Sequence, residues 1–230
     1  MKFGVVVFPG SNCDHDAYYA SSVNAGYDVE YLWHKDSSIP SDIDCIILPG
    51  GFSYGDYLRC GAIARFSPIM NEVIRFANNG KYVIGICNGF QILTESGLLP
   101  GTLLKNNNLK FICKDVYLKV ENTYTKFTKE YKSNEVIRIP IAHGEGNYFA
   151  EESVISELEN NNRVIFRYTG ADGNFDVAAN PNGSVNDIAG IISAGGNVLG
   201  MMPHPERYSD NILGCSDGIR IFISIANNLN

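Results

Sequence analysis

The sequence predicts an α/β fold built on a doubly wound, mostly parallel sheet to which antiparallel strands are added. Two observations predict it. From the N-terminus to Pro100, continuous apolar runs alternate with helix-like segments, and such runs are typical of parallel strands buried on both faces. Beyond Pro100, apolar residues alternate with polar ones instead, which is typical of antiparallel strands with one solvated face. Strand–helix alternation implies right-handed crossovers and helices on both faces of the sheet.

Turn residues divide the first half of the chain into short elements. Apolar runs of strand length end at Pro9-Gly10 and again at Pro49-Gly50-Gly51. Ser67-Pro68 predicts the N-cap and first position of a helix that Gly80 ends. The other expected elements are strands at residues 3–8, 28–33, 45–48 and 82–86 and helices at residues 14–25 and 90–96.

The second half predicts half-solvated strands, a hairpin and a closing helix. Apolar residues alternate with polar ones through 116–120, and less regularly through 136–141. Strands at 188–192 and 198–202 are joined across Ala194-Gly195-Gly196 as a hairpin. The asparagine runs at 106–108 and 160–162 predict polar loops with no assigned chemistry. A further strand is expected at 164–168, and the helix at 218–227 places Ile219, Phe222, Ile223 and Ala226 on one face.

Length and composition bound the class of protein. With 230 residues and 45% hydrophobic content, the chain can bury a core without disulfides, and we expect a single domain over residues 1–230. The formal net charge of −7 and the lack of a Lys/Arg-rich run argue against nucleic acid and membrane partners. The six cysteines are dispersed without a C-x-x-C pair, so neither a metal site nor a disulfide framework is expected. No run suits a signal peptide or a membrane span, so we expect a cytoplasmic protein.

The run 82–93 is the centre of the predicted chemistry. It predicts a strand, then Cys87 flanked by Gly85 and Gly89, then a helix, which is the nucleophile-elbow arrangement with sulfur in place of the serine hydroxyl. This turn exposes the thiol at a helix N-terminus, where unpaired N–H groups and the helix dipole favour a thiolate. A buried structural cysteine explains G-x-C-x-G alone equally well. Gln91 and a motif near the C-terminus favour the nucleophile.

That second motif is Pro203-His204-Pro205-Glu206. Side chains two apart in extended backbone point the same way, so His204 and Glu206 can lie side by side, and Pro205 restricts the backbone around them. A carboxylate beside an imidazole selects its tautomer and stabilises the imidazolium, the orienting role in a catalytic triad. Alone, the motif is more often a surface turn. In a chain with a cysteine elbow it predicts a general base and its orienting carboxylate.

Together the two motifs resemble those of class I, triad-type glutamine amidotransferases. Within that class the chain is most similar to glutaminase subunits of phosphoribosylformylglycinamidine synthase, and residues 100–135 match least. The resemblance implies a flavodoxin-like fold with the site at the carboxyl ends of the parallel strands. Besides Gly85 to Gln91 and Pro203 to Glu206, it rests on Phe8-Pro9-Gly10-Ser11-Asn12-Cys13-Asp14, Leu48-Pro49-Gly50-Gly51-Phe52-Ser53-Tyr54-Gly55-Asp56, His143-Gly144-Glu145-Gly146-Asn147-Tyr148 and Asn180-Pro181-Asn182-Gly183-Ser184.

The resemblance implies that Cys87 attacks the side-chain amide of L-glutamine, giving a γ-glutamyl thioester and ammonia. His204 would take the thiol proton, protonate the leaving ammonia and later activate the deacylating water, with Glu206 orienting it. The chemistry agrees with this reading, because a thiolate is a good amide nucleophile and an amine leaving group needs a delivered proton.

The remaining site residues surround this triad. An oxyanion hole is expected from the backbone N–H of Asn88, which follows the nucleophile, and from that of Gly51 or Phe52 in the glycine loop. The family motif implies that Gln91 contacts the substrate glutamine. His143 is placed in the same pocket, with a structural role as an equal alternative. The roles of four more residues stay open. Asp14 and His15 can lie at an edge of the site or on a partner surface. For Asp56 and Arg59, an ordinary ion pair is the simpler interpretation.

No ATP-binding signature occurs in the sequence, so we expect no cofactor in this chain. The resemblance implies that ATP and magnesium are used by a larger synthetase subunit, which converts formylglycinamide ribonucleotide to formylglycinamidine ribonucleotide in de novo purine biosynthesis. It also implies a small third subunit.

Two other classes compete with this reading. A cysteine-elbow hydrolase of the PfpI-like peptidase or stress-protein kind would lack Gln91 and the His-Pro-Glu arrangement. A non-catalytic docking subunit would lack a member of the triad, and all three are present. Ammonia release from glutamine, measured with and without the synthetase, distinguishes the three classes.

Overall fold

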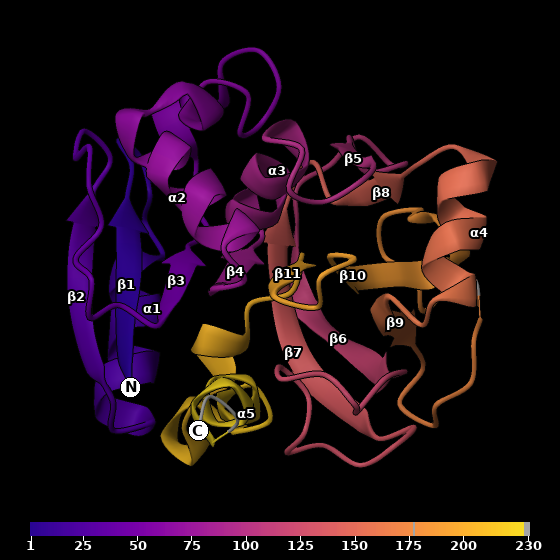
Figure 1. Ribbon diagram of the computed structural model, residues 1–230. Coiled ribbons are helices and arrows are strands. Elements are labelled where there is room, and N and C mark those ends of the chain that lie inside the picture. The colour runs from indigo at the N-terminus through magenta and orange to yellow at the C-terminus, as the bar shows by residue number, and fades with distance from the viewer. Residues whose placement is uncertain (177, 228–230) are drawn as a thin grey trace.

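The computed structural model describes residues 1–176 and 178–227. Over these residues a nine-stranded sheet runs through the molecule in the order β2-β1-β3-β4-β11-β10-β9-β6-β7, while β5 and β8 form a separate two-stranded sheet (Figure 1). None of the helices in this part of the chain is long and apolar enough to span a bilayer. The strands are β1 (Lys2–Val7), β2 (Asp28–Trp33), β3 (Cys45–Leu48), β4 (Tyr82–Ile86), β5 (Thr102–Leu104), β6 (Ile112–Val120), β7 (Val136–His143), β8 (Asn147–Phe149), β9 (Val164–Thr169), β10 (Ile188–Ile192) and β11 (Val198–Met201).

The half of the sheet from β2 to β11 is parallel. The chain begins in β1, moves outward to β2, and then crosses back to β3 and β4, which is the doubly wound order that the sequence predicts. Every residue of β3 and β11 is buried, as continuous apolar runs require. In β11, Gly200 lies opposite Gly85 of β4. The segments that follow these two strands therefore leave the sheet side by side, at its carboxyl edge.

The other half of the sheet is antiparallel, and it curls. Strands β10, β9, β6 and β7 are each antiparallel to the preceding strand, and Val116 and Leu118 of β6 are buried as predicted. Although β7 is the last strand in the order, it returns to the segment that follows β11. There the His204 N–H donates to the Pro140 carbonyl oxygen at 2.8 Å. An edge strand thus becomes a wall of the region beside the parallel strands.

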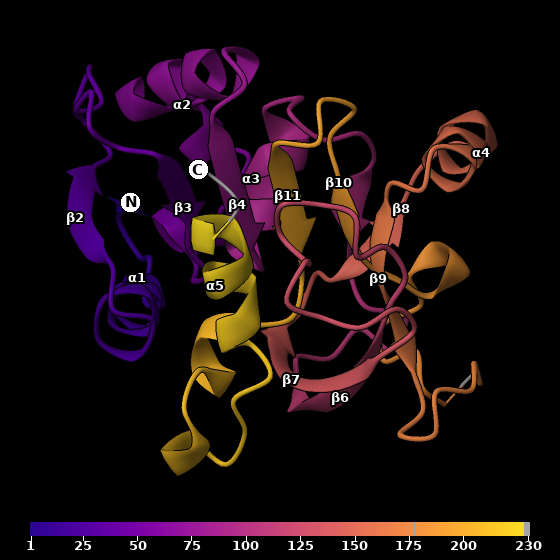
Figure 2. The same cartoon turned by 60° about the horizontal axis from the view of Figure 1, so that its bottom comes forward.

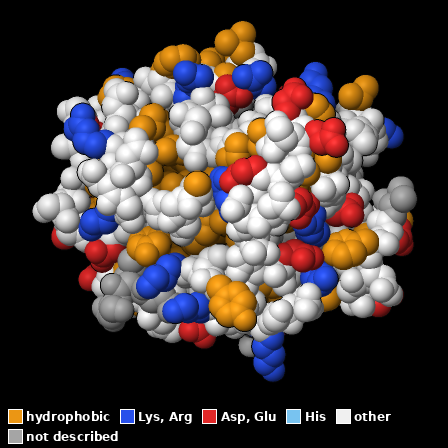
Figure 3. All heavy atoms as spheres, turned by 45° about the vertical axis from the view of Figure 1, so that its right-hand side comes forward, with side chains coloured by type: hydrophobic (Ala, Val, Ile, Leu, Met, Phe, Trp, Pro, Cys, Tyr) orange, Lys and Arg blue, Asp and Glu red, His pale blue; other side chains and the backbone are white. Residues whose placement is uncertain are grey.

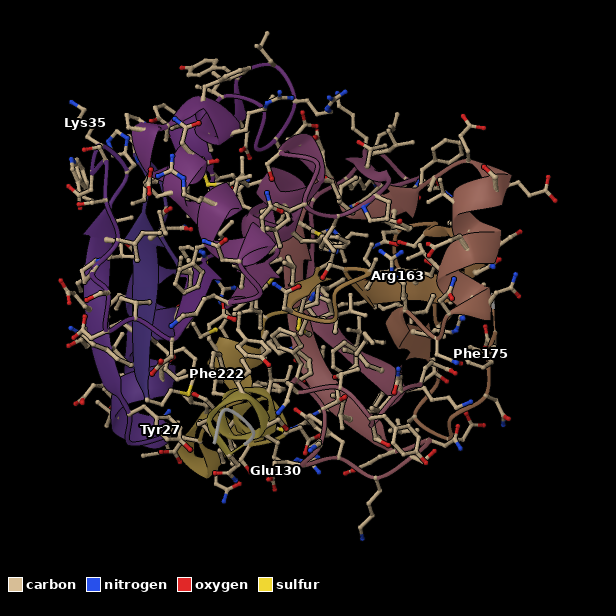
Figure 4. All side chains as sticks on the ribbon, in the orientation of Figure 1. Tyr27, Lys35, Glu130, Arg163, Phe175 and Phe222 are labelled. Carbon is tan, nitrogen blue, oxygen red and sulfur yellow. The ribbon has the colours of Figure 1, made fainter. Side chains whose placement is uncertain are left out.

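Helices cover both faces of the parallel half (Figures 1 and 2). On one face, α2 buries Ile69, Met70 and Val73. On the opposite face lie α1 and α5, and Phe222 of α5 points toward the sheet (Figure 4), where its ring meets that of Phe3 edge-to-face at 6.4 Å. The helices are α1 (Asp14–Tyr19), α2 (Pro68–Asn78), α3 (Asn88–Glu95), α4 (Glu152–Asn160) and α5 (Ile219–Asn227).

Some elements differ from the sequence-based expectation. The helix expected over 14–25 changes its winding after α1 and continues as a single π-helical stretch, Ala20–Asn24. Helix α4 and the short strands β5 and β8 were not predicted, because α4 has few apolar residues and the two strands have three residues each. In α5 the buried face includes Ile221 and Ile225, whereas Ile219 and Ile223 are partly exposed, and the helix packs against the segments Ala20–Asn24 and Pro205–Tyr208.

Candidate active site

Cys87 lies at a strained turn between β4 and α3, as the elbow motif predicts. Its φ of 51° and ψ of −105° lie outside the regions that side-chain-bearing residues favour. The turn is tight: a Cβ added to Gly89 would lie 1.9 Å from the carbonyl oxygen of Leu48. The Cys87 N–H is held by the Met201 carbonyl oxygen of β11 at 2.7 Å. Glycine is therefore required at 89 for close packing, and the backbone strain is stored at the candidate nucleophile.

His204 and Glu206 form a buried pair immediately after β11. Nδ1 of His204 lies 2.6 Å from Oε1 of Glu206, and the two residues are 1% and 2% exposed. Burial alone would lower the pKa of His204, but the charge of Glu206 and the nearby thiol of Cys87 together raise that pKa well above its ordinary value. The carboxylate places the ring proton on Nδ1, and among the described residues Nε2 has no partner. Nε2 is therefore the ring nitrogen through which His204 can exchange a proton with the nucleophile and the substrate.

Nucleophile and base come together because β4 and β11 are neighbouring parallel strands. Ile86 lies opposite Met201 at the last register position, so Cys87 and the segment leading to His204 leave the sheet at the same edge. The thiol of Cys87 points to the carbonyl oxygen of Ala142 in β7 at 3.7 Å. The site is thus enclosed between the parallel strands and the curled edge strand.

The glycine loop after β3 carries Gly51 and Phe52, two of the residues expected to form the oxyanion hole. Gly51 has φ 135°, and a Cβ there would lie 2.7 Å from the backbone nitrogen of Asn12, so this position needs glycine. The Phe52 N–H already donates to the Gly10 carbonyl oxygen at 3.0 Å. That N–H is therefore engaged in this conformation, whereas Asn88 opens α3 directly after the nucleophile. The oxyanion-hole assignment of Gly51, Phe52 and Asn88 stays a prediction.

The side chain of Gln91 is buried and bridges two elements. Its Nε2 donates to the Glu145 carbonyl oxygen at 2.6 Å, and its Oε1 accepts from Nδ2 of Asn88 at 2.8 Å. Gln91 therefore ties α3 to the loop between β7 and β8. Because a side-chain amide nitrogen carries two N–H groups, one donor is left for a ligand.

His143 ends β7 and is fixed in one tautomer by Asn106. Nδ2 of Asn106 donates to the carbonyl oxygens of Lys110 and His143, so its Oδ1 is the acceptor that faces Nδ1 of His143 at 3.1 Å. The proton therefore lies on Nδ1, and the buried Nε2 is an acceptor without a partner among the described residues. Burial, and then the charge of His204, lower the pKa of His143 to about 4. The ring stays neutral near pH 7.

Sequence reasoning missed the role of Asn106, which is fully buried within a run expected to be a polar loop. The Asn180–Ser184 motif has a similar structural role. Nδ2 of Asn182 donates to the Gly146 carbonyl oxygen at 2.8 Å, and Oγ of Ser184 accepts from the Tyr148 N–H at 3.0 Å. Both motifs hold the loop that carries His143 and Glu145. The sequence marks the run 180–183 as a turn, but nothing in it places this turn beside the loop that carries His143.

The four residues with open roles have the following partners. Nδ1 of His15 meets the hydroxyl of Tyr31 at 3.4 Å, and Asp14 accepts from the His15 N–H. Asp56 does not pair with Arg59; it lies 3.5 Å from Nδ2 of Asn88, and burial raises its pKa. The ion pair of Arg59 is made with Glu95 instead, at 2.9 Å through Nη2.

One cluster of potential metal-ligating side chains lies at the triad. Among the described residues, Cys13, His204 and Glu206 bring their ligand atoms within 4.8 Å of one another. The His204–Glu206 hydrogen bond occupies two of these atoms, and Nη2 of Arg207 donates to Sγ of Cys13 at 3.1 Å. A guanidinium at that distance disfavours a bound cation, so this cluster is an extension of the triad. All six cysteines are free thiols.

Acidic and basic side chains are interspersed on the face of the molecule drawn in Figure 3. Lys and Arg lie between Asp and Glu there, with apolar side chains in the hollow at the centre of the view. The charged side chains drawn on this face are therefore of both signs.

Comparisons with known proteins agree with the geometry. The model of the CobB/CobQ-like glutamine amidotransferase domain matches residues 1–215. Two curated relatives are named phosphoribosylformylglycinamidine synthase subunit PurQ. The one from Moorella thermoacetica is 60% identical, covering 98% of this chain and 95% of its own. The one from Salinibacter ruber is 55% identical, covering 99% and 97%.

Solved structures match as well. The structure of PurLQS from Thermotoga maritima aligns over 100% of this chain and 99% of that chain, with 47% identity and a TM-score of 0.88. The glutaminase domain of Trypanosoma brucei CTPS, with bound acivicin, aligns over 99% of this chain and 94% of its own, with 11% identity and a TM-score of 0.60, which shows a shared fold.

Proposed function

The chain belongs to the CobB/CobQ-like glutamine amidotransferase family, and on that premise we propose how it acts. It is the glutaminase subunit of a phosphoribosylformylglycinamidine synthase and works with a synthetase subunit. The observation that carries the mechanism is the buried His204–Glu206 pair beside the strained Cys87. Such an arrangement can activate a thiol, protonate an amine leaving group and activate water in turn.

In the proposed reaction, Nε2 of His204 takes the proton of the Cys87 thiol, and the sulfur bonds to the side-chain carbonyl carbon of glutamine. Collapse of the tetrahedral intermediate breaks the C–N bond, while the imidazolium delivers a proton to the departing ammonia. Water, deprotonated by the same nitrogen, then attacks the γ-glutamyl thioester; the C–S bond breaks, glutamate forms, and the imidazolium returns the proton to the Cys87 sulfur. Glu206 stabilises each imidazolium through its 2.6 Å hydrogen bond.

The tetrahedral oxyanion needs backbone donors aimed at it. The proposed donors are the N–H groups of Asn88, at the N-terminus of α3, and of Gly51. Phe52 is engaged with Gly10, and the loop after it holds Tyr54, Asp56 and Leu58 at positive φ. We infer that docking of the partner rearranges this strained loop and completes the oxyanion hole, which would keep the free subunit a poor glutaminase.

Substrate binding is assigned to two buried side chains. The second N–H of the Gln91 amide can donate to a carboxylate of glutamine, since the first is used by Glu145. Nε2 of His143 can accept from a substrate N–H, because Asn106 keeps that nitrogen unprotonated. Both contacts place glutamine between α3 and the end of β7.

The synthetase partner is proposed to be PurL, which would use ATP and magnesium to convert formylglycinamide ribonucleotide to formylglycinamidine ribonucleotide with the ammonia made here. The small subunit PurS is proposed as a third component. This proposal is supported by the match of the whole chain to one chain in the structure of PurLQS from Thermotoga maritima.

Replacement of the nucleophile tests the division of labour. Cys87→Ala in the assembled complex should abolish glutamine-dependent synthesis, with a loss of about a millionfold at the glutaminase step by analogy with other nucleophile knockouts. The same complex supplied with ammonium salt at mildly alkaline pH should still make product. Failure of ammonia to rescue an assembled Cys87→Ala complex would refute the division of labour. Full glutaminase turnover by the isolated chain would refute only the gating.

A further inference from the structure

A second thiol lies against the triad, and the mechanism above gives it no part. Cys13 is the residue directly before α1, and its side chain is 2% exposed. Its Sγ and the ligating atoms of His204 and Glu206 lie within 4.8 Å of one another. The sulfur therefore belongs to the immediate surroundings of the candidate base.

Two neighbours hold this sulfur in place. Nη2 of Arg207 donates to Sγ of Cys13 at 3.1 Å, and the Cys13 thiol points to Oδ1 of Asn12 at 3.5 Å. Arg207 is itself restrained, because its Nε lies 3.6 Å from a carboxylate oxygen of Asp16. The Cys13 sulfur is thus restrained between the guanidinium of Arg207 and the amide oxygen of Asn12.

The backbone closes the remaining side of the imidazole. A Cβ added to Gly50 would lie 2.7 Å from Cε1 of His204 and 3.2 Å from Sγ of Cys13. The His204 ring is therefore enclosed by the Glu206 carboxylate, the Cys13 sulfur and the backbone at Gly50. Close packing on these sides opposes rotation of the ring away from its hydrogen bond to Glu206.

We propose that Cys13 is a positioning residue of the glutaminase: its sulfur, held by Arg207 and Asn12, fixes the His204 ring between Glu206 and Cys87. This inference rests on the proposed function, since it concerns the same base. It assigns Cys13 no bond to the substrate and no step of its own. The sulfur acts through the position and the charge of the imidazole.

The electrostatic surroundings of His204 agree with this role. Burial lowers the pKa of His204, while Glu206, then Cys87 and Cys13, raise it. His143 is a further titratable neighbour of His204, since the charge of His204 lowers the pKa of His143. Loss of the Cys13 sulfur should therefore make the imidazolium less stable as well as less well placed.

The test uses the complex with its synthetase, carrying Cys13→Ala, Cys13→Ser or Cys45→Ala. Cys45 is a matched control, because it is a fully buried thiol in β3 whose sulfur faces the Ile46 carbonyl oxygen, away from the triad. Measured quantities are kcat and KM for glutamine, the pH profile of kcat/KM, and ammonium-dependent synthesis. Histidine side-chain NMR on the isolated chain, which has four histidines, adds a readout that needs no activity.

Cys13→Ala is expected to lower kcat about ten- to hundredfold, the usual effect of removing a supporting partner of a functional side chain, with KM changed less than kcat. The pH profile should shift, and the His204 titration should move to lower pH. Cys13→Ser, which keeps a hydroxyl for Arg207 and Asn12, should recover part of the loss. Ammonium-dependent synthesis should be unchanged in all variants.

Three outcomes decide the matter. An unshifted His204 titration together with unchanged kcat in Cys13→Ala would overturn the inference. Equal loss of kcat in Cys45→Ala would also overturn it, since the effect would then be that of any lost buried thiol. A parent complex without glutaminase activity would refute the proposed function instead, while the NMR comparison would still report whether Cys13 positions the ring.

Discussion

The backbone N–H of His204 donates a 2.8 Å hydrogen bond to the carbonyl oxygen of Pro140. Pro140 belongs to β7, the outermost strand of the antiparallel half. Two residues further along this strand, the Ala142 carbonyl oxygen faces the thiol of Cys87 at 3.7 Å. Strand β7, which is the last in the sheet order and far from β4 and β11, therefore positions both the candidate base and the candidate nucleophile.

Replacement of the orienting carboxylate should separate catalysis from folding. Glu206→Gln is nearly isosteric, but an amide cannot stabilise the imidazolium and can favour the wrong tautomer of His204. We expect glutamine hydrolysis to slow by up to about ten-thousandfold, as in the analogous serine-protease variant. Steady-state glutaminase assays in the complex, with circular dichroism as the folding control, provide the measurement. Near-normal turnover would reduce Glu206 to a structural residue.

The close packing of the backbone at Gly50 against the His204 ring can be tested by substitution of this glycine. In Gly50→Ala the new methyl would lie 2.7 Å from Cε1 of His204, so the ring must shift, and a displacement of about 1 Å can cost about a hundredfold in rate. Gly144→Ala is the matched control, because its nearest neighbour, in Phe111, is 3.9 Å away. Comparison of kcat for the two variants checks this. Similar losses in both would argue that the loops, rather than the ring, are being perturbed.

Thiol labelling should select Cys87. An electrophilic glutamine analogue needs a thiol at the substrate site, and Cys45 and Cys60 are poor competitors because burial raises the pKa of each. Brief labelling followed by peptide mapping should find modification at Cys87 before any other cysteine. Exposed Cys113 serves as the internal control for reactivity without recognition. Preferential modification of Cys13 or Cys60 would contradict the assignment of the nucleophile.

His143 should make stability depend on pH. Its pKa is lowered to about 4 in the folded chain by burial and by the charge of His204, whereas an unfolded histidine titrates near 6.5. The unfolded chain therefore binds an extra proton between these values, and the stability that is present above pH 6.5 is lost as pH falls toward 4. The loss from this residue between pH 7 and pH 5 is about 2 kcal/mol.

Urea unfolding at the two pH values, in the parent and in His143→Asn, isolates this contribution. The variant should be less stable at pH 7 and should show a smaller fall in the free energy of unfolding on acidification. Identical pH dependence in the two chains would mean that the His143 ring is protonated in the folded state as readily as in the unfolded one.

The sequence by itself determined the local elements and the chemistry they carry. Continuous apolar runs predicted β1 to β4, and the glycines around Cys87 predicted its strained turn, because only a residue without a side chain fits where α3 approaches β3. The motif at 203–206 predicted the pairing of His204 and Glu206, which the structure shows. The extended backbone expected there was wrong, because Glu206 lies in a short 3-10 helix, Pro205–Tyr208. These properties depend on residues close in sequence, where backbone geometry alone restricts the outcome.

Tertiary structure decided which distant segments meet. No pattern in residues 136–143 predicts that β7 curls back to hold His204. The burial of Asn106 was not predicted either, because the polarity of its run indicated a loop. The sequence offered the Phe52 N–H as an oxyanion donor, and the packing of the Gly10 turn against the glycine loop gives that N–H a backbone acceptor. Such contacts depend on how the whole sheet bends and on which buried polar groups remain to be paired. They are properties of the completed core, and no local stretch of sequence specifies them.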